Sequence, residues 1–371
     1  MLDSFHLSLT HVGVALLLGV SGVSAGDAGS YSAHAPEPAA DLWMYPNASS
    51  PGTRGMASTF SYLPYTGVDD RFAQFVIKFD TVAAGIPAGL GPGNYDVHRL
   101  VLTTVYGSSD SLPYDPTEDP RASLGSAATI ADPDAGRPLE LHGTGFRGGF
   151  SASTFLESSG FGSRNAFASS FDAAGVARDV TNNVTLGYDS DPWAIGKVSA
   201  PVDINAEPRV YVPLTPGQTI PVYSHVAFEI NMGIPGVADY VRQGLHRGSL
   251  WFTISSFHSV TEMSSSGFPA YFTKENTEQA IYHDVASTLD AEYSLPIRIT
   301  AFNRNSVANT VSLTWNGSPG FRYIVEKTDD LVTGVWSQLG TFTTAAPAPL
   351  SWSGTSVSPH AFFRIARSPQ P

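Results

Sequence analysis

The sequence predicts an all-β protein made of two β-sandwiches in series, the first over residues 41–293 and the second over residues 295–368. Short runs of alternating apolar and polar residues recur along the chain, and this period is that of a half-buried strand. The 371 residues include 35 glycines and 27 prolines, which disfavour helix interiors by about 1 and about 3 kcal/mol each. An apolar content of 42 % supplies a core for each part.

The N-terminus has the pattern of an export signal. An apolar run over residues 12–23 is followed by Ser24 and Ala25, the small residues that a signal peptidase prefers. We therefore expect a cleaved signal peptide over residues 1–25, a flexible leader over residues 26–40, and a secreted or cell-surface protein. The segment before the apolar run lacks Lys and Arg, so an uncleaved segment or a mis-assigned start is the alternative. The run is too short for a permanent anchor, and we expect no membrane span in the mature chain.

The strands of the first domain follow from period-two patterns. In residues 72–79, Phe75, Ile77 and Phe79 share one face, and a second run covers residues 97–106. Apolar residues at helical spacing predict one short helix over residues 237–245. Residues 107–200 have no sustained period, so we expect irregular strands and long loops there. Further strands are expected over residues 209–213, 222–230 and 249–257.

The second domain is predicted to be a small β-sandwich. Strand candidates over residues 311–315, 321–327 and 360–366 belong to a series of strand and turn signals at roughly ten-residue spacing. Trp315 ends the first of these strands on its inward face. No internal repeat is evident.

Charge and cysteine content exclude several classes of function. The formal net charge is −13, and an acidic protein repels phosphate backbones, so we expect no nucleic-acid partner. The chain has no cysteine, which excludes disulfides, thiolate metal sites and a cysteine nucleophile.

Several of these segments resemble the DNRLRE-type module of secreted bacterial proteins. The resemblance rests on Arg71, the strand of residues 75–80, the turn of residues 86–89 and the strand of residues 97–106. The later amphipathic helix, followed by Gly248 and an apolar strand, also fits. It implies a jelly-roll sandwich, into which residues 107–200 would add long loop insertions, and some such modules are carbohydrate-binding modules that act on acidic polysaccharides. The insert of residues 107–200 has no counterpart in the family.

The C-terminal part resembles the fibronectin type III-like domains of secreted bacterial proteins. The resemblance rests on residues 313–315 and 323–326, on Trp336 and on residues 362–365. It implies an immunoglobulin-like β-sandwich that spaces or attaches other modules and has no catalytic role.

No catalytic motif is evident, and no residue is assigned to catalysis. Zincin, Walker and dinucleotide-binding patterns are missing from the sequence. Glycosidases place their two acids far apart in sequence, and no spacing selects a pair here. The candidate acids are Asp115, Glu118, Glu140, Glu157, Asp189, Asp191, Glu229 and Glu262.

Calcium is the cofactor that the acidic loops favour. Asp132 with Asp134, and Asp189 with Asp191, place carboxylates two residues apart, so that two oxygens can converge on one hard cation. Residues 114–119 form a third candidate. Aspartates in proline-containing turns explain the same spacing without a metal.

A sugar-binding face pairs exposed aromatic rings with polar side chains. Tyr188, Asp189, Asp191 and Trp193 form one candidate, and Trp43 with Arg54 forms another. The sequence therefore predicts a non-catalytic protein that binds a polysaccharide or a cell-surface glycan. One alternative is a structural subunit that self-assembles into an extracellular layer or filament through sheet edges. The other is an unrecognised polysaccharide-degrading enzyme.

Overall fold

The computed structural model describes residues 30–63, 67–124, 132–259, 267–282, 284–295, 297–317, 321–332, 334–345, 348–355 and 361–369. The signal peptide expected over residues 1–25 lies outside these ranges. The chain divides into a larger compact unit, Tyr31–Ala88 with Val97–Tyr293, and a smaller one that contains Gly89–Asp96 and Ser294–Pro371. Both are built from β-strands, so the predicted all-β fold is confirmed.

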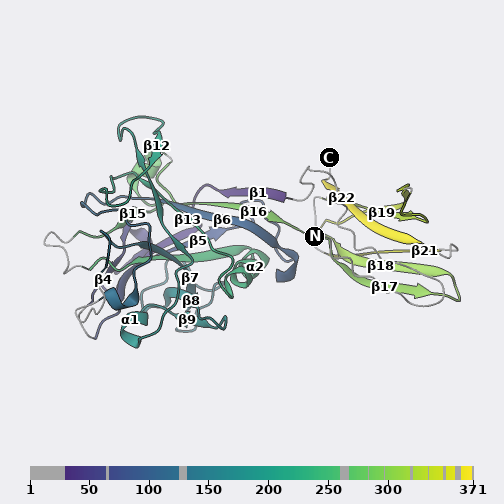
Figure 1. Ribbon diagram of the computed structural model, residues 1–371, viewed down its shortest axis with the longest axis horizontal. Helices are drawn as coiled ribbons and strands as arrows, with labels where there is room; N and C mark the ends of the chain where they lie inside the picture. Colours follow the sequence, from purple (N-terminus) through teal and green to yellow (C-terminus); the bar gives the residue numbers. More distant parts are fainter. Residues whose placement is uncertain are drawn as a thin grey trace. The chain divides into compact units, whose positions relative to one another are not determined.

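The larger unit contains two large sheets (Figure 1). One has, in spatial order, β1 (Ser30–Ala35), β16 (Thr288–Ser294), β6 (Asp96–Val105), β13 (His225–Glu229), β11 (Lys197–Pro201) and β12 (Tyr211–Pro213). The other has β2 (Ala40–Met44), β5 (Arg71–Asp80), β14 (Ser249–Ser256), β7 (Leu139–Phe146), β8 (Ala166–Phe171) and β9 (Ala177–Asp179). In addition, β4 (Phe60–Ser61) pairs with β5, and β10 (Ala194–Ile195) pairs with β7.

The strand order is that of a jelly roll. When β1, β5, β6, β7, β8, β13, β14 and β16 are lettered B to I in chain order, one sheet reads B-I-D-G and the other reads C-H-E-F. The strand β1 corrects the sequence analysis, which assigns residues 26–40 to a flexible leader. Apart from Tyr31, the side chains of β1 are those of Ser, Ala and His, and pairing with β16 supplies the order that this composition does not.

The smaller elements of this unit lie between the main strands. A two-stranded ladder joins β15 (Ala270–Phe272) to β3 (Met56–Ser58). The helices are α1 (Asn183–Leu186), α2 (Val237–Arg247) and α3 (Thr277–Tyr282), and the 3-10 turns are η1 (Pro51–Thr53), η2 (Pro92–Asn94) and η3 (Arg121–Ser123). Helix α2 confirms the helix predicted from apolar spacing, and Gly248, at φ 89°, ends it in the left-handed conformation. None of the helices in the described ranges is both long and apolar enough to cross a membrane.

The register of the central strands separates an apolar face from a polar one. Ile254 on β14 lies opposite Phe75 on β5 and Leu141 on β7, and all three side chains are buried. One residue further along β14, Ser255 lies opposite Glu140. Successive side chains of a strand point to opposite faces, so Glu140 and Ser255 lie on the other face of this sheet, where the site described below is built.

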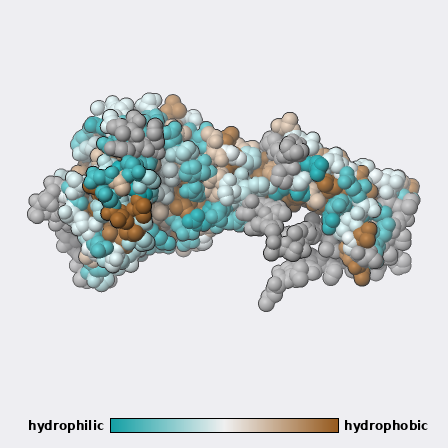
Figure 2. All heavy atoms as spheres, turned by 90° about the horizontal axis from the view of Figure 1, so that it is seen from above, coloured by the Kyte–Doolittle hydropathy of each residue, from teal (hydrophilic) through white to brown (hydrophobic). Residues whose placement is uncertain are grey.

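The hairpin of β11 and β12 carries apolar side chains on its surface. Figure 2 views the molecule from the side on which β12 projects in Figure 1, and apolar residues interrupt the hydrophilic surface there. The exposed large apolar side chains of this segment are Val202, Ile204, Val210 and Val212.

The smaller unit is a sandwich of two three-stranded sheets. One has β17 (Ile299–Asn305), β18 (Thr310–Gly317) and β21 (Ala348–Thr355), and the other has β20 (Ser337–Thr343), β19 (Phe321–Thr328) and β22 (Phe362–Pro369). Lettered in chain order, they read A-B-E and C′-C-F, as in immunoglobulin-like sandwiches. Trp315 and Tyr323, one from each sheet, are buried in the core between them.

Candidate functional site

A cavity of about 510 Å³ lies in the larger unit, where segments far apart in sequence meet. Arg71 comes from the start of β5, Glu140 comes from β7, and Phe257 follows β14. The loop before η3 and the segment around α1 complete the wall. Five acids line the cavity against two arginines, Arg71 and Arg121. These acids are Glu118, Asp119, Glu140, Asp189 and Asp191.

Arg71 ties three parts of the cavity together. Its Nε and Nη2 atoms donate to Oε2 of Glu140 at 3.0 and 2.8 Å. Its Nη1 atom donates to the carbonyl of Val180 and to the side-chain oxygen of Asn183. The ring of Phe257 lies 4.1 Å from the guanidinium carbon. One buried side chain thus joins β5, β7 and the turn that leads into α1.

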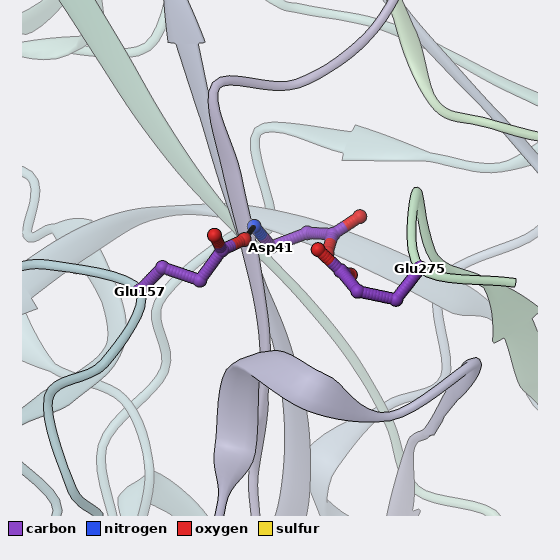
Figure 3. A group of neighbouring side chains, drawn as sticks. All are labelled: Asp41, Glu157 and Glu275. Carbon is purple, nitrogen blue, oxygen red and sulfur yellow. Dashed lines mark hydrogen bonds between the residues drawn. The ribbon is translucent and has the colours of Figure 1, made fainter.

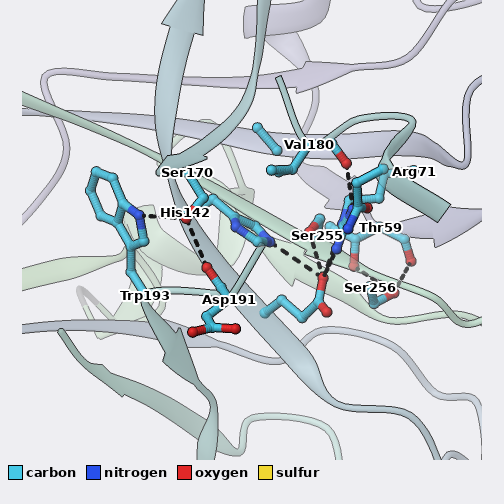
Figure 4. Close-up of polar contacts among 12 residues, drawn as sticks. Thr59, Arg71, His142, Ser170, Val180, Asp191, Trp193, Ser255 and Ser256 are labelled. Carbon is cyan, nitrogen blue, oxygen red and sulfur yellow. Dashed lines mark hydrogen bonds and ion pairs between the residues drawn. The ribbon is translucent and has the colours of Figure 1, made fainter. Parts of the chain in front are cut away.

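Glu140 is a buried carboxylate that stays ionised. Its Oε2 atom also accepts hydrogen bonds from Ser255 Oγ at 3.2 Å and from His142 Nε2 at 3.3 Å (Figure 4). Burial opposes the charge, but the positive charge of Arg71 and the bond from His142 lower the pKa of Glu140 to about 2. Burial lowers the pKa of His142, so its ring is neutral at pH 7 and donates from Nε2.

Glu118 has the opposite character. Desolvation at the cavity wall, together with the negative charges of Asp191 and Glu140, raises the pKa of Glu118 to about 7. A carboxyl group with this pKa exchanges a proton near neutral pH. The cavity therefore contains one acid whose pKa is lowered, Glu140, and two whose pKa values are raised to about 7, Glu118 and Asp119.

The loop after α1 is held on two sides. Arg121 Nε donates to Asp189 Oδ1 at 2.7 Å, and Ser170 Oγ donates to the carbonyl of Asp191 at 2.7 Å. The side chains of Asp189 and Asp191 remain exposed at the cavity. These contacts place two of the sequence-predicted binding residues, Asp189 and Asp191, at the site.

Trp193 is a correction to the sequence analysis, which assigns it to sugar stacking. Its side chain is 1 % exposed, and its ring is stacked on Phe171 with centroids 5.9 Å apart. Its Nε1 atom donates to Ser170 Oγ at 3.1 Å, and a Cβ atom on Gly143 would lie 2.1 Å from its ring (Figure 4). Tyr188 is half-buried and donates to the carbonyl of Asp179 instead of lining the cavity.

Trp43 and Arg54 come together but form a separate surface. The Trp43 ring stacks on Tyr45 with centroids 4.6 Å apart, and the Arg54 guanidinium carbon lies 5.8 Å from the Trp43 ring. The indole nitrogen donates to the carbonyl of Ser58 at 2.8 Å. None of these residues lines the acidic cavity.

In each of the two predicted calcium pairs, one aspartate forms an ion pair with an arginine. Asp132 Oδ2 forms an ion pair with Arg137 Nη1 at 2.6 Å, and Asp189 is paired with Arg121. Asp134 instead belongs to a group with Asp115 and Asp119, in which one ligand atom from each residue lies within 4.8 Å of the others. The carboxylates that lie near Asp134 therefore come from the loop of residues 114–119, whereas the sequence analysis pairs Asp134 with Asp132.

A second acidic group surrounds Asp41 on β2. Figure 3 shows Asp41 between the side chains of Glu157 and Glu275. Lys274 Nζ contacts Glu157 at 2.8 Å and Glu275 at 2.9 Å. Burial, followed by the interaction with Glu275, raises the pKa of Asp41 to about 9, so Asp41 is protonated at neutral pH.

Of the eight candidate acids, Glu262 lies outside the described residues. Four of the other seven converge in the cavity: Glu118, Glu140, Asp189 and Asp191. The sequence analysis does not predict Arg71 and Asn183 as site residues. Alternation in Leu139-Glu140-Leu141-His142 is a signal for a strand with one polar buried face, but only the pairing with β14 shows what that face meets.

Comparisons of this chain with protein-family models, with curated proteins and with solved structures found no match.

Proposed function

We propose that this chain is a secreted or cell-surface carbohydrate-binding protein and that the acidic cavity of the larger unit is its binding site. The observation that carries the proposal is the convergence of Glu118, Glu140, Asp189 and Asp191 with Asn183 and Arg121 around one cavity. Carboxylate, amide and guanidinium groups match the donors and acceptors of sugar hydroxyls.

The charge of the cavity narrows the class of glycan. Five acids face two arginines, and Arg71 is already bound to Glu140. An acidic polysaccharide would bring further negative charge to this wall, whereas a neutral or amino-bearing sugar would not. We therefore propose a neutral or amino-bearing glycan rather than the acidic polysaccharide that the family resemblance implies.

The buried network beneath the cavity supports a preformed site. Arg71 and Glu140 have little freedom to move, because each is held by several hydrogen bonds below the surface. A rigid wall lowers the entropy lost when a ligand binds. Exposed acids at the rim, Glu118 and Asp191, then supply the contacts that vary with the ligand.

A polysaccharide panel tests this proposal on the full chain. The panel includes neutral polymers, an amino-bearing polymer such as chitosan, and acidic polymers such as pectate. D191N is expected to weaken binding to the polymer that the wild type binds at least about tenfold, because it removes one charged hydrogen bond. R54A, on the separate Trp43 surface, is the matched control and is expected to bind as the wild type does.

Two outcomes overturn the assignment. If the wild-type chain binds none of the polymers in the panel, the proposal of carbohydrate binding is contradicted. Loss of binding in R54A with normal binding in D191N moves the site to the Trp43 surface.

Glycoside hydrolysis is the second candidate function, and the pKa of Glu118 favours it. A carboxyl group with a pKa of about 7 can protonate a glycosidic oxygen, while the nearby Asp191 carboxylate activates water or attacks the sugar carbon. Release of reducing ends by the wild type but not by E118Q would support this activity. A loss of this activity in E118Q that exceeds its loss of polymer binding would separate catalysis from recognition.

A further inference from the structure

Asp115, Asp119 and Asp134 bring three carboxylate groups to one point beside the cavity. One ligand atom of each lies within 4.8 Å of the other two. Asp115 is 2 % exposed, and the side chain of Asp119 is 3 % exposed, whereas Asp134 lies at the surface. Two buried aspartates and one exposed aspartate thus bring their carboxylate groups together near the protein surface.

Two buried oxygens of this group have no hydrogen-bond donor. These are Oδ2 of Asp115 and Oδ1 of Asp119, and neither has a partner among the described residues. A buried carboxylate oxygen without a partner is costly, because it has lost its hydration and gained nothing in return. The contacts within the described protein therefore leave two carboxylate oxygens of this group without a partner.

The contacts of Thr117 also indicate that a proton or a cation is missing from this group of carboxylates. Its Oγ1 atom lies 2.7 Å from Oδ1 of Asp115 and 2.7 Å from Oδ2 of Asp134. A hydroxyl has one proton to donate, so it can satisfy only one of the two carboxylates. The other contact brings two oxygen lone pairs together unless a proton or a cation lies between them.

Arg137 does not neutralise the group. Its Nη1 atom donates to Asp119 Oδ2 at 2.7 Å and to Asp132 Oδ2 at 2.6 Å. One guanidinium therefore faces two carboxylates before Asp115 and Asp134 are counted.

We propose that Asp115, Asp119 and Asp134 bind one calcium ion. Calcium takes six to eight oxygen ligands and accepts irregular geometry, and the three carboxylates would supply the charged part of that set. Water and backbone carbonyls would complete it at the exposed side, near Asp134. The oxygen-only donor set and the exposed side suit calcium better than a transition metal.

The group around Asp41 gives an internal contrast. It also contains three carboxylates, but Lys274 Nζ lies within 2.9 Å of both Glu157 and Glu275. An ammonium group already occupies the place that a cation would take. We therefore expect calcium at Asp115, Asp119 and Asp134 and not at Asp41.

The bound ion would hold part of the cavity wall in place through the backbone that connects its ligands. Glu118 stands between the ligand Asp119 and the ligand Asp115, and both Glu118 and Asp119 line the cavity. Fixing the two aspartates fixes the backbone that carries Glu118. This inference concerns the metal alone and does not require that the cavity binds a sugar.

Terbium luminescence and thermal unfolding of the full chain test the site. After treatment with a chelator, the wild type is expected to bind Tb³⁺, to release it to excess Ca²⁺, and to melt at a higher temperature in 1 mM Ca²⁺ than without it. D134N removes an exposed ligand and is expected to fold normally but to bind calcium at least about tenfold more weakly. T117V is expected to weaken binding about tenfold or more through the position of the two aspartates.

E275Q is the matched control, because it changes one acid of the other group. It is expected to retain the calcium-dependent rise in melting temperature. No terbium binding and no calcium shift in the wild type would overturn the proposal, as would an unchanged calcium response in both D134N and D115N. Loss of the calcium-dependent rise in melting temperature in E275Q alone would place the ion at the group around Asp41, and it would also refute the assignment.

Discussion

Glu140 accepts two hydrogen bonds from the guanidinium of Arg71, and both side chains are almost fully buried, with exposed fractions of 6 % and 2 %. The pair joins β5 to β7 although β14 lies between them in the sheet. A buried ion pair of this kind does little for stability when compared with a well-packed apolar pair, but its two halves depend on each other. Its role is to fix the geometry of the cavity wall.

Removing one half of this pair is expected to be costly. E140Q leaves the charge of Arg71 without a counter-charge in a buried place, so we expect a loss of about 3–5 kcal/mol in the free energy of unfolding. Urea denaturation measures it. D189N breaks the exposed pair with Arg121 and is the control, with an expected loss below about 1 kcal/mol. Equal losses in the two variants would mean that burial does not distinguish the pairs.

Asp41 is expected to make stability fall as the pH rises. Burial and Glu275 raise its pKa from 3.8 to about 9 in the folded chain. The folded state therefore keeps a proton that the unfolded state has lost, and this stabilisation is full below pH 4 and disappears as the pH rises through 9. Asparagine cannot ionise, so D41N should flatten the decline of the melting temperature between pH 6 and 9. An identical pH profile for D41N and wild type would contradict the assignment.

Trp193 and Gly143 are expected to be coupled. W193A should lose about 3–5 kcal/mol as a core deletion, and G143A should lose about 1–3 kcal/mol because its Cβ would lie 2.1 Å from the indole ring. The double variant should lose less than the sum, since the deleted ring leaves room for the methyl group. G93A, where the Cβ meets no atom within 4 Å, is the near-neutral control. Strict additivity in urea denaturation would show that the two sites do not interact.

Trp315 offers a test of the smaller unit. Its ring is fully buried against Phe342, and Nε1 has no hydrogen-bond partner among the described residues. W315A is expected to destabilise this unit by about 3–5 kcal/mol. W315F keeps an aromatic ring and removes the unsatisfied donor, so it should cost much less. Equal thermal destabilisation by the two substitutions would mean that the ring contributes no packing of its own.

Sequence patterns predicted the regular parts of the fold. Period-two runs marked β5, β6, β13 and β14, and apolar spacing marked α2, because each of these elements buries one face. The strand β1 was missed, since Tyr31 is the one large apolar residue in it and its order comes from a partner at the far end of the domain. Strands β7 to β9 lay within residues 107–200, where glycine and serine obscure the alternation.

The site was harder to predict because loops assemble it. The acids Glu118, Glu140 and Asp191 belong to three segments, and only tertiary pairing brings them to one cavity. Trp193 was misassigned for a related reason. Its neighbours Asp191 and Pro192 indicate a surface turn, but Gly143, on a distant strand, provides the space in which the indole is buried.

The neighbouring positions of β1 and β16 have a consequence for how the protein is made. These are the first and last strands of the larger unit, and they lie side by side in one sheet. A ribosome must therefore synthesise almost the whole domain before that ladder can close, and until then one edge of β6 waits without its partner. Pairings between such distant segments are slow to form and leave incomplete chains open to aggregation, so we expect that edge of β6 to be exposed to aggregation until its final strand has paired.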